Sequence, residues 1–450
     1  MDENVLEKRM ERLHIPTGDA CNNRCIFCNE YPRKRGSVPT DDLARLQMET
    51  YRNNERVIFT HGEPTLNPDL LARIKYAKEL GFPYICLVTN GRLLSDKELC
   101  HKLVDAGLND ITISLHGHNA EIHDTLTTVK GSFEHSFQAI LNFAELRDDY
   151  DIDLYLSTVL NKINLPYMYD MLSTFISLDI DKATFKHPRI HGRSLKNFDR
   201  VVPALSEMAK AFTDAVEKLS KECPMSIILS LVALFEIPYC LMSGYEMFVQ
   251  KNEIVLGLDK ESTKLTRIES MGNICMRKEC SDCVYCAICP GIEVEYIEYF
   301  GWNDFKPRRE YSPAFQEFLK MPVYVDLRDK IKWQTFPEDE KTNASREIDD
   351  SIAVLKSEND LSEDEKANMC FDVGKRYLML NKPRKALKFL NYTTRHTPTH
   401  GGAQLKKAMA LIALNKVVPA KRVLRKAERC ILDPQSIGEL NELKKLLEQV

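Results

Sequence analysis

The chain has 450 residues, of which 44% are apolar and 28% are charged, and its formal net charge is −4. This length and composition are typical of a globular protein with two or three domains. The small net charge gives no general attraction to nucleic acid or to an anionic membrane, so we expect neither as a partner. No apolar stretch approaches the roughly twenty residues of a membrane-spanning helix. The charged N-terminus lacks the pattern of a signal peptide, and fourteen cysteines without one favour a reducing, cytoplasmic location.

Short apolar segments alternate with amphipathic ones from residue 10 to about residue 220. The apolar segments are rich in Ile, Val, Leu, Phe and Tyr, as buried parallel strands are, and cover residues 12–17, 56–60, 84–89, 110–115, 153–159 and 182–186. Helical patterns cover residues 69–80, 95–106, 133–146, 165–176 and 202–219. Strand and helix units that alternate in this way predict a parallel, right-handed α/β structure.

Three cysteines follow the first predicted strand. Cys21, Cys25 and Cys28 form the pattern C-x-x-x-C-x-x-C. A 4Fe–4S cluster held by protein alone takes four cysteine ligands, so three would leave one iron open to a small molecule. Such dense cysteines favour a metal site; the alternatives are three structural thiols, or three zinc ligands with a distant fourth.

Further motifs follow the ends of the later predicted strands in chain order. They are His61-Gly62-Glu63-Pro64, Thr89-Asn90-Gly91, the segment 112–117, and Ser157 with Asn161. Together with the cysteine motif and Phe27, they resemble the radical S-adenosylmethionine superfamily over about residues 8–310. One departure is His61, where many members have glycine, a residue that permits close approach of the backbone.

The resemblance implies a partial (β/α)6 barrel whose site lies at the carboxyl ends of the strands. It implies that the three cysteines hold a 4Fe–4S cluster, that S-adenosyl-L-methionine binds its fourth iron, and that a donor such as flavodoxin or ferredoxin reduces it. The cofactor-binding residues it assigns are Phe27, Gly62, Glu63, Pro64, Asn90, Ser114, Ser157 and Asn161. Glu63 would pair with the methionyl ammonium, and Ser157 and Asn161 would bind the ribose. The implied chemistry is hydrogen abstraction by a 5′-deoxyadenosyl radical.

Other polar residues near the expected barrel mouth have two interpretations. His116 and His118 follow the fourth predicted strand, and Lys186, His187 and Arg189 follow the sixth. Each could be a solvated or structural side chain. The first two could instead contact substrate or transfer a proton, and the other three could contact the adenine or an anionic substrate.

A second cysteine-rich segment extends from Cys275 to Cys289, and Cys240 stands alone upstream. Because C-x-x-C pairs suit tetrahedral zinc, a zinc ribbon is one interpretation. The segment also resembles the auxiliary-cluster region of the twitch and SPASM extensions of the superfamily. That resemblance implies an auxiliary 4Fe–4S cluster on Cys240, Cys280, Cys283 and Cys289, with Cys275 and Cys286 as alternative ligands.

The last part of the chain changes to a helical pattern that repeats every 34 residues, as Gly374 and Ala408 show. This is the length of a tetratricopeptide repeat, whose consensus also matches Tyr377, Ala386 and Pro398. From residue 361 on, eighteen Lys and Arg face nine Asp and Glu. Such a surplus indicates either a solvated helix face or a docking groove for an acidic peptide.

These patterns divide the chain into a barrel (residues 8–222), an auxiliary-cluster extension (223–325), an acidic linker (326–360) and helical repeats (361–450). The predicted function is a radical S-adenosylmethionine enzyme that abstracts hydrogen from a peptide or protein. The alternatives are the same chemistry on a small-molecule metabolite, and an iron–sulfur interaction scaffold or sensor.

Overall fold

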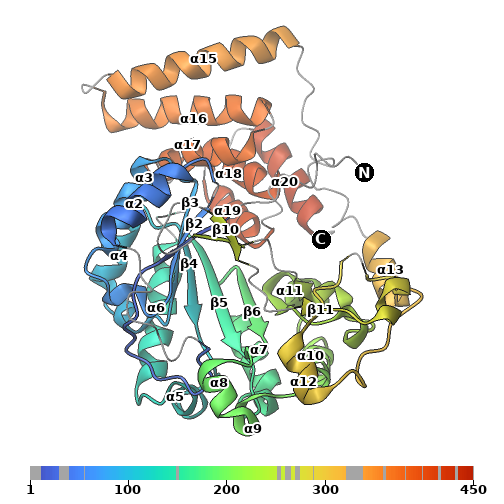
Figure 1. Ribbon diagram of the computed structural model, residues 1–450. Coiled ribbons are helices and arrows are strands. Elements are labelled where there is room, and N and C mark those ends of the chain that lie inside the picture. The colour runs from blue at the N-terminus through green and yellow to red at the C-terminus, as the bar shows by residue number, and fades with distance from the viewer. Residues whose placement is uncertain are drawn as a thin grey trace. The chain divides into compact units, whose positions relative to one another are not determined.

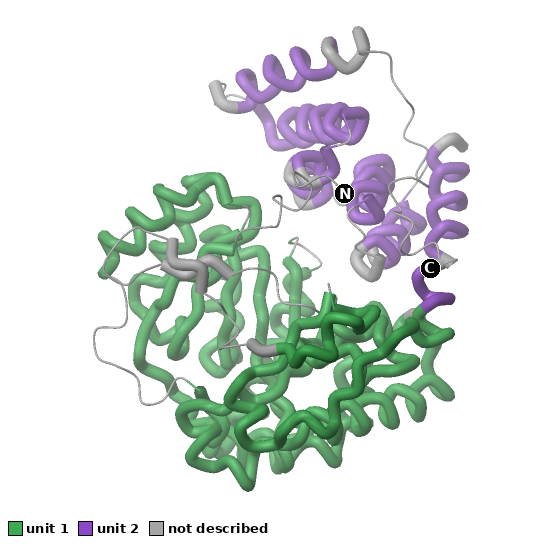
Figure 2. The backbone as a smooth tube through the Cα atoms, turned by 45° about the vertical axis from the view of Figure 1, so that its right-hand side comes forward, with its two compact units in different colours: residues 1–315 green, residues 316–450 purple. Residues whose placement is uncertain are grey.

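The computed structural model describes residues 12–29, 40–54, 56–147, 150, 152–250, 255–258, 265–268, 274–286, 288–320, 338–357, 361–380, 382–397, 399–413, 417–430 and 434–448. The chain divides into two compact units, one of residues 1–315 and one of residues 316–450 (Figure 2). No described helix combines the length and the apolar character needed to cross a membrane.

A mostly parallel β-sheet forms the centre of the first unit (Figure 1). Its strands are β1 (Arg12–Pro16), β2 (Arg56–Thr60), β3 (Tyr84–Thr89), β4 (Asp110–Ser114), β5 (Asp153–Val159), β6 (Lys182–Lys186), β7 (Val232–Phe235), β8 (Val249–Gln250), β9 (Val255–Leu258) and β10 (Leu265–Ile268). Their order in the sheet is β10-β9-β1-β2-β3-β4-β5-β6-β7-β8, and all neighbours are parallel except β9 and β10. β1 to β6 match the six predicted strands, which confirms the parallel α/β class. β7 to β10 extend the sheet beyond them on both sides.

Helices connect these strands and surround the sheet (Figure 1). The α-helices are α2 (Asp41–Thr50), α3 (Leu70–Glu79), α4 (Lys97–Ala106), α5 (Ala120–Thr127), α6 (Ser132–Leu146), α7 (Met168–Ser177), α8 (Gly192–Lys196), α9 (Phe198–Val201), α10 (Leu205–Leu219), α11 (Met225–Leu231), α12 (Val294–Phe300) and α13 (Pro313–Lys320). Short 3-10 helices are η1 (Pro64–Leu66), η2 (Arg92–Ser95), η3 (Leu165–Tyr167), η4 (Tyr239–Leu241), η5 (Glu246–Phe248) and η6 (Lys278–Asp282). β11 (Ile274–Cys275) and β12 (Ile292–Glu293) form a separate antiparallel pair.

The two faces of the sheet differ in polarity. Leu13 and Ile15 of β1 are fully buried, whereas His14 between them is half-buried, and β4, β5 and β6 also alternate. Successive side chains of a strand point to opposite faces, so the apolar set packs in the core. The half-buried set includes polar residues such as Ser157 and Lys186. The sheet therefore has one apolar face and one face with polar groups near its carboxyl edge.

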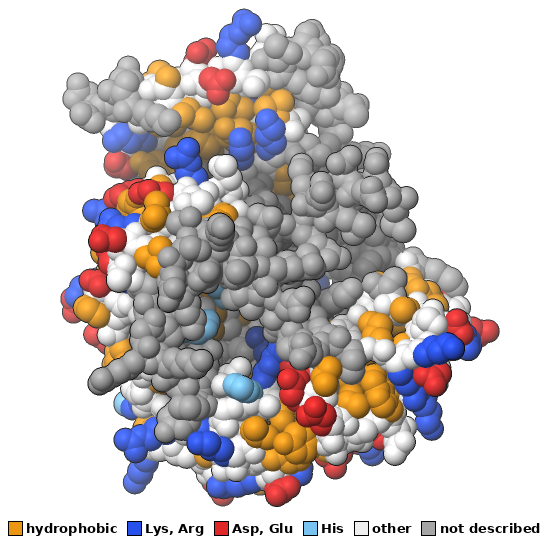
Figure 3. Space-filling view, in the orientation of Figure 1, with side chains coloured by type: hydrophobic (Ala, Val, Ile, Leu, Met, Phe, Trp, Pro, Cys, Tyr) orange, Lys and Arg blue, Asp and Glu red, His pale blue; other side chains and the backbone are white. Residues whose placement is uncertain are grey.

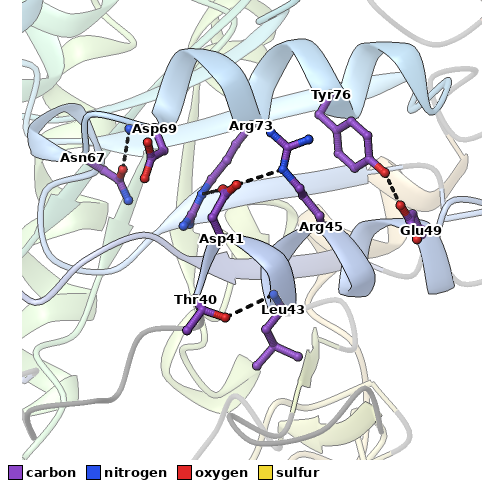
Figure 4. Close-up of polar contacts among 9 residues, drawn as sticks. All are labelled: Thr40, Asp41, Leu43, Arg45, Glu49, Asn67, Asp69, Arg73 and Tyr76. Atoms are coloured by element: carbon purple, nitrogen blue, oxygen red, sulfur yellow. Dashed lines mark hydrogen bonds and ion pairs between the residues drawn. The ribbon is translucent and has the colours of Figure 1, made fainter.

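Helix α2 is held on α3 by polar contacts (Figure 4). The Thr40 hydroxyl accepts a hydrogen bond from the Leu43 backbone N–H and caps the start of α2. The Asp41 carboxylate accepts from the Nε of Arg45 at 2.8 Å and from the Nε of Arg73 on α3 at 3.0 Å. The Tyr76 hydroxyl donates to Glu49 at the other end of α2. These contacts fix the first helix that follows the cysteine motif.

The second unit is entirely helical where it is described. Besides the end of α13, its helices are α15 (Glu338–Ser357), α16 (Glu363–Met379), α17 (Pro383–His396), α18 (Gly401–Ala413), α19 (Val417–Glu428) and α20 (Pro434–Glu448). Their buried side chains form one apolar core, which includes Ile348 of α15. Residues 338–357 of the predicted linker instead form a helix, because Ala344, Ile348 and Ile352 recur every four residues and give the acidic segment one apolar face.

Gly374 allows close packing of α16 against α17. A Cβ atom at this position would lie 2.7 Å from the Cγ of Leu390. At Gly438 in α20, by contrast, a Cβ would meet nothing within 4 Å. Close packing therefore requires a glycine at position 374, whereas no neighbour prevents a larger residue at position 438. The tetratricopeptide interpretation of these helices stays a prediction, and Pro398 of its consensus lies outside the described residues.

A buried ion pair joins α6 to the strands behind it. The Nη2 atom of Arg147 donates to both carboxylate oxygens of Asp181 at 2.7 Å, and its Nη1 donates to the Asp179 carbonyl. Asp181 also accepts from the Leu154 backbone N–H in β5. The Arg147 side chain is 2% exposed and that of Asp181 is 9% exposed. Removal of one partner would leave a buried charge without its counterion.

We therefore expect Arg147→Leu to lower the free energy of unfolding by about 3 kcal/mol, because the Asp181 carboxylate loses its guanidinium. Urea denaturation followed by circular dichroism measures the change. The control is Lys97→Leu, which removes an exposed pair with Glu145 and should change stability by less than about 0.5 kcal/mol. Equal effects of the two substitutions would contradict this account.

A second pair of variants tests the packing of the helical unit. Alanine favours a helix over glycine by about 1 kcal/mol, so Gly438→Ala should stabilise α20. Gly374→Ala should instead destabilise the unit by roughly 1–3 kcal/mol, because the new methyl group meets Leu390. The thermal midpoint of the helical signal should therefore move in opposite directions in the two variants. A rise in both would show that α16 and α17 do not need their close approach.

Candidate functional site

The cysteine motif forms a loop directly after β1, at the carboxyl edge of the sheet. Cys21, Cys25 and Cys28 lie within eight consecutive residues of this loop. Burial, and next the neighbouring Cys28 and Cys21, raise the pKa of Cys25 to about 12. The Cys21 Sγ accepts hydrogen bonds from the Asn23 backbone N–H at 3.5 Å and from the Asn90 side-chain amide at 3.8 Å. Adjacent thiols with N–H donors beside them fit the ligands of an iron–sulfur cluster.

The loop is held at its middle and at its end by two helices. The backbone N–H groups of Arg24 and Ile26 donate to the last carbonyls of α5, each at 3.0 Å. The Arg193 backbone N–H in α8 donates to the Cys28 carbonyl at 2.9 Å, and the Asn197 side chain donates to the Ile26 carbonyl at 3.0 Å. These bonds involve the backbone of the loop and leave the sulfur atoms available for a metal.

Gly62 supports the start of the loop through close backbone contact. It has φ +62°, and a Cβ there would lie 2.4 Å from the Gly18 carbonyl oxygen and 2.6 Å from that of Ala20. The Glu63 backbone N–H donates to the same Ala20 carbonyl at 2.8 Å. His61 also has a positive φ, of 68°, which a glycine adopts without strain. Its side chain is exposed, so the departure from glycine changes the backbone energy rather than the space at the loop.

The buried Glu63 carboxylate joins the end of β2 to the end of β3. Its Oε1 accepts from the Thr65 hydroxyl at 2.6 Å, the Thr65 backbone N–H at 3.1 Å and the Thr89 hydroxyl at 2.5 Å. Its Oε2 accepts from the Asn90 backbone N–H at 2.7 Å. A carboxylate oxygen has two lone-pair sites, so Oε2 keeps capacity for one further donor. The pairing of Glu63 with the methionyl ammonium stays a prediction. Pro64, the next residue, begins η1.

The predicted ribose contacts differ in their surroundings. Ser114 and Ser157 are Cα partners at the ends of β4 and β5, and both are half-buried. Asn161 is fully buried, and its side chain holds the following turn: its Nδ2 donates to the Val159 carbonyl and its Oδ1 accepts from the Ile163 backbone N–H. The structure therefore brings the two serines together on the sheet and gives Asn161 local partners.

Two stacked histidines support Phe27. The ring of Phe27 packs edge-on against His116 with 4.7 Å between centroids, and His116 stacks on His123 at 5.7 Å. The Nδ1 of His116 accepts from the Val159 backbone N–H, and the Nδ1 of His123 accepts from the His116 backbone N–H. Burial lowers the pKa of both rings, that of His123 to about 4. Both are therefore neutral near pH 7. His123 was no sequence candidate, because no motif marks it.

The later cysteines also come together. Burial, and next Cys289, Cys283 and Cys280 among its neighbours, raise the pKa of Cys240 to about 11. The Cys283 Sγ accepts from the Arg308 backbone N–H at 3.3 Å. Cys286 is half-buried beside this group, and the side chain of Cys275 lies outside the described residues. In the described part of the chain, no group of three Cys, His, Asp or Glu side chains is compact enough to hold a single metal ion. An iron–sulfur cluster needs less compact ligands, because each cysteine binds a separate iron.

An aromatic group packs behind these later cysteines. Tyr239 and Tyr285 stack with 5.2 Å between ring centroids. The Tyr285 hydroxyl donates to buried Glu246 at 2.7 Å, and the other Glu246 oxygen accepts from the Ser312 hydroxyl at 2.7 Å. Each aromatic residue precedes or lies between cysteines in the sequence. The packing therefore fixes the backbone from which the sulfur atoms project.

The contact of Gly62 with the loop gives a direct test. We expect Gly62→Ala to lower the free energy of unfolding by about 3 kcal/mol and to reduce the iron bound after anaerobic reconstitution, because the new methyl group displaces Gly18 and Ala20.

The matched control is Gly81→Ala, which has a similar φ of +87° but where a Cβ meets nothing within 4 Å. It should cost about 1 kcal/mol and leave iron binding unchanged. Iron and sulfide counting with thermal denaturation measures both variants. Full iron binding by Gly62→Ala would contradict the predicted dependence of the loop on this contact.

Comparison with known proteins places these motifs in a family. Residues 15–174 match the model of the radical SAM superfamily. The chain is 30% identical over 192 residues to the PqqA peptide cyclase of Rhodopseudomonas palustris. This alignment covers 42% of the present chain and 49% of the relative. It is 28% identical over 219 residues to the GTP 3′,8-cyclase of Aquifex aeolicus, covering 46% of this chain and 67% of the relative.

A solved structure of SuiB from Streptococcus suis, bound to the precursor peptide SuiA, is also similar. It aligns over 49% of both chains with 16% identity and a TM-score of 0.39. The present chain spans about half the length of the first curated relative it matches. The family that matches here uses a 4Fe–4S cluster and S-adenosylmethionine. Residues 15–174, which hold the cysteine loop and the motifs at the ends of β2 to β5, are therefore the part of the chain that matches the radical S-adenosylmethionine superfamily.

Proposed function

We propose that the chain is a radical S-adenosylmethionine enzyme that abstracts hydrogen from a peptide or protein. The observation that carries the proposal is the group of three adjacent thiols, Cys21, Cys25 and Cys28, in a loop held at the carboxyl edge of a parallel sheet. In parallel α/β folds the loops at this edge carry the functional site. The matching family model covers the same loop.

In this proposal the three cysteines hold the cluster, and the remaining iron takes S-adenosylmethionine. When bound, the two groups supply a 5′-deoxyadenosyl radical that removes hydrogen from a substrate carbon. Because ligation requires the thiolate, the raised pKa of Cys25 means that cluster loading releases its proton. The Asn90 side chain would donate to the Sγ atom of Cys21, and the Glu63 carboxylate would hold the Asn90 backbone N–H in place. Ser114 and Ser157 would bind the cofactor through their hydroxyl groups.

An auxiliary 4Fe–4S cluster on Cys240, Cys280, Cys283 and Cys289 is part of the proposal. Its support is the mutual effect of these thiols on the pKa of Cys240 and the backbone N–H groups that donate to their sulfur atoms. Such a cluster would pass an electron from the substrate or bind the substrate. A flavodoxin or ferredoxin is the proposed source of the electron that reduces the first cluster.

A peptide substrate is favoured by two separate features. The curated relatives include peptide cyclases of two bacteria, Rhodopseudomonas palustris and Bradyrhizobium diazoefficiens. The helices from residue 361 on carry a basic surplus that would dock an acidic peptide. The GTP 3′,8-cyclase of Aquifex aeolicus, of which the chain covers 67%, favours the second candidate, which is the same chemistry on a small molecule.

Cysteine substitutions test the division of labour between the two groups. After anaerobic reconstitution and reduction with dithionite, the chain should convert S-adenosylmethionine to 5′-deoxyadenosine and bind roughly eight irons. Cys25→Ala should abolish that conversion, because it removes a ligand of the first cluster. Cys283→Ala should preserve the conversion and lose about four irons.

Cys223→Ala is the control, since Cys223 belongs to neither group, and it should change neither measurement. A folded Cys283→Ala chain without 5′-deoxyadenosine formation would show that the two groups are not independent. A reconstituted wild-type chain that forms none would favour the interaction scaffold or sensor.

A further inference from the structure

Glu236 has an unusual backbone conformation at the carboxyl edge of the sheet. It directly follows β7, and its φ is +57°, a left-handed value that is unfavourable for a side chain of this size. The register pairs Lys186 at the end of β6 with Phe235, so Glu236 lies beside the residues that follow β6. Strained non-glycine residues at the ends of strands often accompany a functional role. Glu236 lies outside the matched family region and outside every sequence motif.

One carboxylate oxygen of Glu236 is paired and the other is not. The Oε2 atom forms an ion pair with the Nη2 of Arg189 at 3.1 Å, and Arg189 also pairs with Glu293 of β12 through its Nη1. The Oε1 atom is buried and has no hydrogen-bond partner among the described residues. A buried acceptor without a donor is unfavourable for folding, so a donor from beyond the described residues, such as a bound ligand, would stabilise Glu236.

The charges around Glu236 restrict what that partner can be. Burial raises the pKa of Glu236 to about 7; Arg189 and Lys186 oppose the rise, and Glu293 adds to it. The Lys186 Nζ lies above the Phe235 ring, 5.0 Å from its centroid. Two basic side chains would repel a cationic ligand, and the Glu236 and Glu293 carboxylates would repel an anionic one. A neutral N–H donor satisfies the acceptor without either penalty.

Other charged groups stand near this position on neighbouring elements. Arg12 of β1 and Arg189 lower the pKa of Lys186, after burial, which is the main cause. His187, next to Lys186, has a pKa lowered to about 4 by burial and is neutral. In the lower half of the face drawn in Figure 3, side chains of histidine, of basic and of acidic residues lie near one another. The surroundings of Glu236 are therefore polar and include both basic and acidic groups.

We propose that Glu236 recognises the substrate by accepting a hydrogen bond from a neutral amide N–H on its Oε1 atom, while Arg189 holds its other oxygen. This inference rests on the proposed function and adds to it a specificity-determining residue for a peptide amide. The proposed contact involves only Glu236 and the substrate, so the proposed roles of the cluster and of S-adenosylmethionine stay the same. It also explains why an unfavourable φ and an unpaired buried oxygen occur in the same residue.

A pair of small probes tests this recognition. N-acetylalanine methylamide carries two amide N–H donors, and its counterpart methylated on both nitrogens carries none. Saturation-transfer NMR on the reconstituted full chain measures the affinity for each probe without turnover. At pH 8, above the pKa of Glu236, the wild type should bind the N–H probe roughly tenfold more tightly, as expected for a hydrogen bond to a charged group.

Glu236→Gln should abolish that preference. With Arg189 donating to the amide oxygen, the glutamine NH2 takes the place of Oε1 and presents a donor where the substrate also has one. Glu236→Gly should also abolish it, and its thermal midpoint should stay or rise because glycine relieves the positive φ. The control is Glu295→Gln, which removes a negative charge close to Glu293. This variant should keep the preference for the N–H probe.

Two results would overturn the proposal. The first is an unchanged preference in Glu236→Gln and Glu236→Gly, which would leave the residue a purely structural role, most clearly if both variants also melt at lower temperature. The second is a wild type that binds the two probes equally. Formation of 5′-deoxyadenosine is measured separately and does not depend on the probes, so failure of the proposed function is distinguished from failure of this inference.

Discussion

The buried carboxylate of Glu63 is the interaction on which the arrangement of the site depends. A charge removed from water must be compensated by donors, and this one is compensated by four, which come from Thr65, Thr89 and the backbone of Asn90. The donors belong to the ends of two adjacent strands, so the carboxylate fixes those ends relative to each other. The Glu63 backbone N–H extends the same constraint to Ala20, one residue before the first cysteine. The position of the cysteine loop is thus set by hydrogen bonds that reach across β1, β2 and β3.

Much of the fold was predictable because parallel strands that are buried on one face carry a clear composition. β1 to β6 are short, apolar and separated by helical patterns, and each was located from the sequence. The apolar run 227–235 shows where this reasoning ends. The chain changes there from α11 to β7 at residue 232, and a run that is apolar except for Ser230 has no clear period that separates the two states. Helix α15 was hidden by its acidic composition, although its apolar residues recur at helical spacing.

The site was predictable where a motif names the residue and not where tertiary packing decides its role. The cysteines, Glu63 and Asn90 occur in recognisable segments, and the structure brings them together. His123 and Glu236 belong to no segment of that kind, because their roles arise from stacking on His116 and from pairing with Arg189. The environment of Asn161 illustrates the same limit. Its place after β5 follows from the sequence, whereas the use of its amide in the local turn is decided by the folded structure.

The distribution of backbone strain connects these parts. Among the described residues, the non-glycine positions with positive φ are His61, Thr128 and Glu236. The first precedes the glycine that contacts the loop, and the hydroxyl of the second donates to the Arg24 carbonyl within the loop at 3.1 Å. The third follows β7 at the same edge of the sheet. Strain of this kind persists only when the surrounding core is stable enough to impose it. The apolar face of the sheet, with residues such as Leu13 and Ile15 fully buried, therefore stabilises the unfavourable conformations that its carboxyl edge requires.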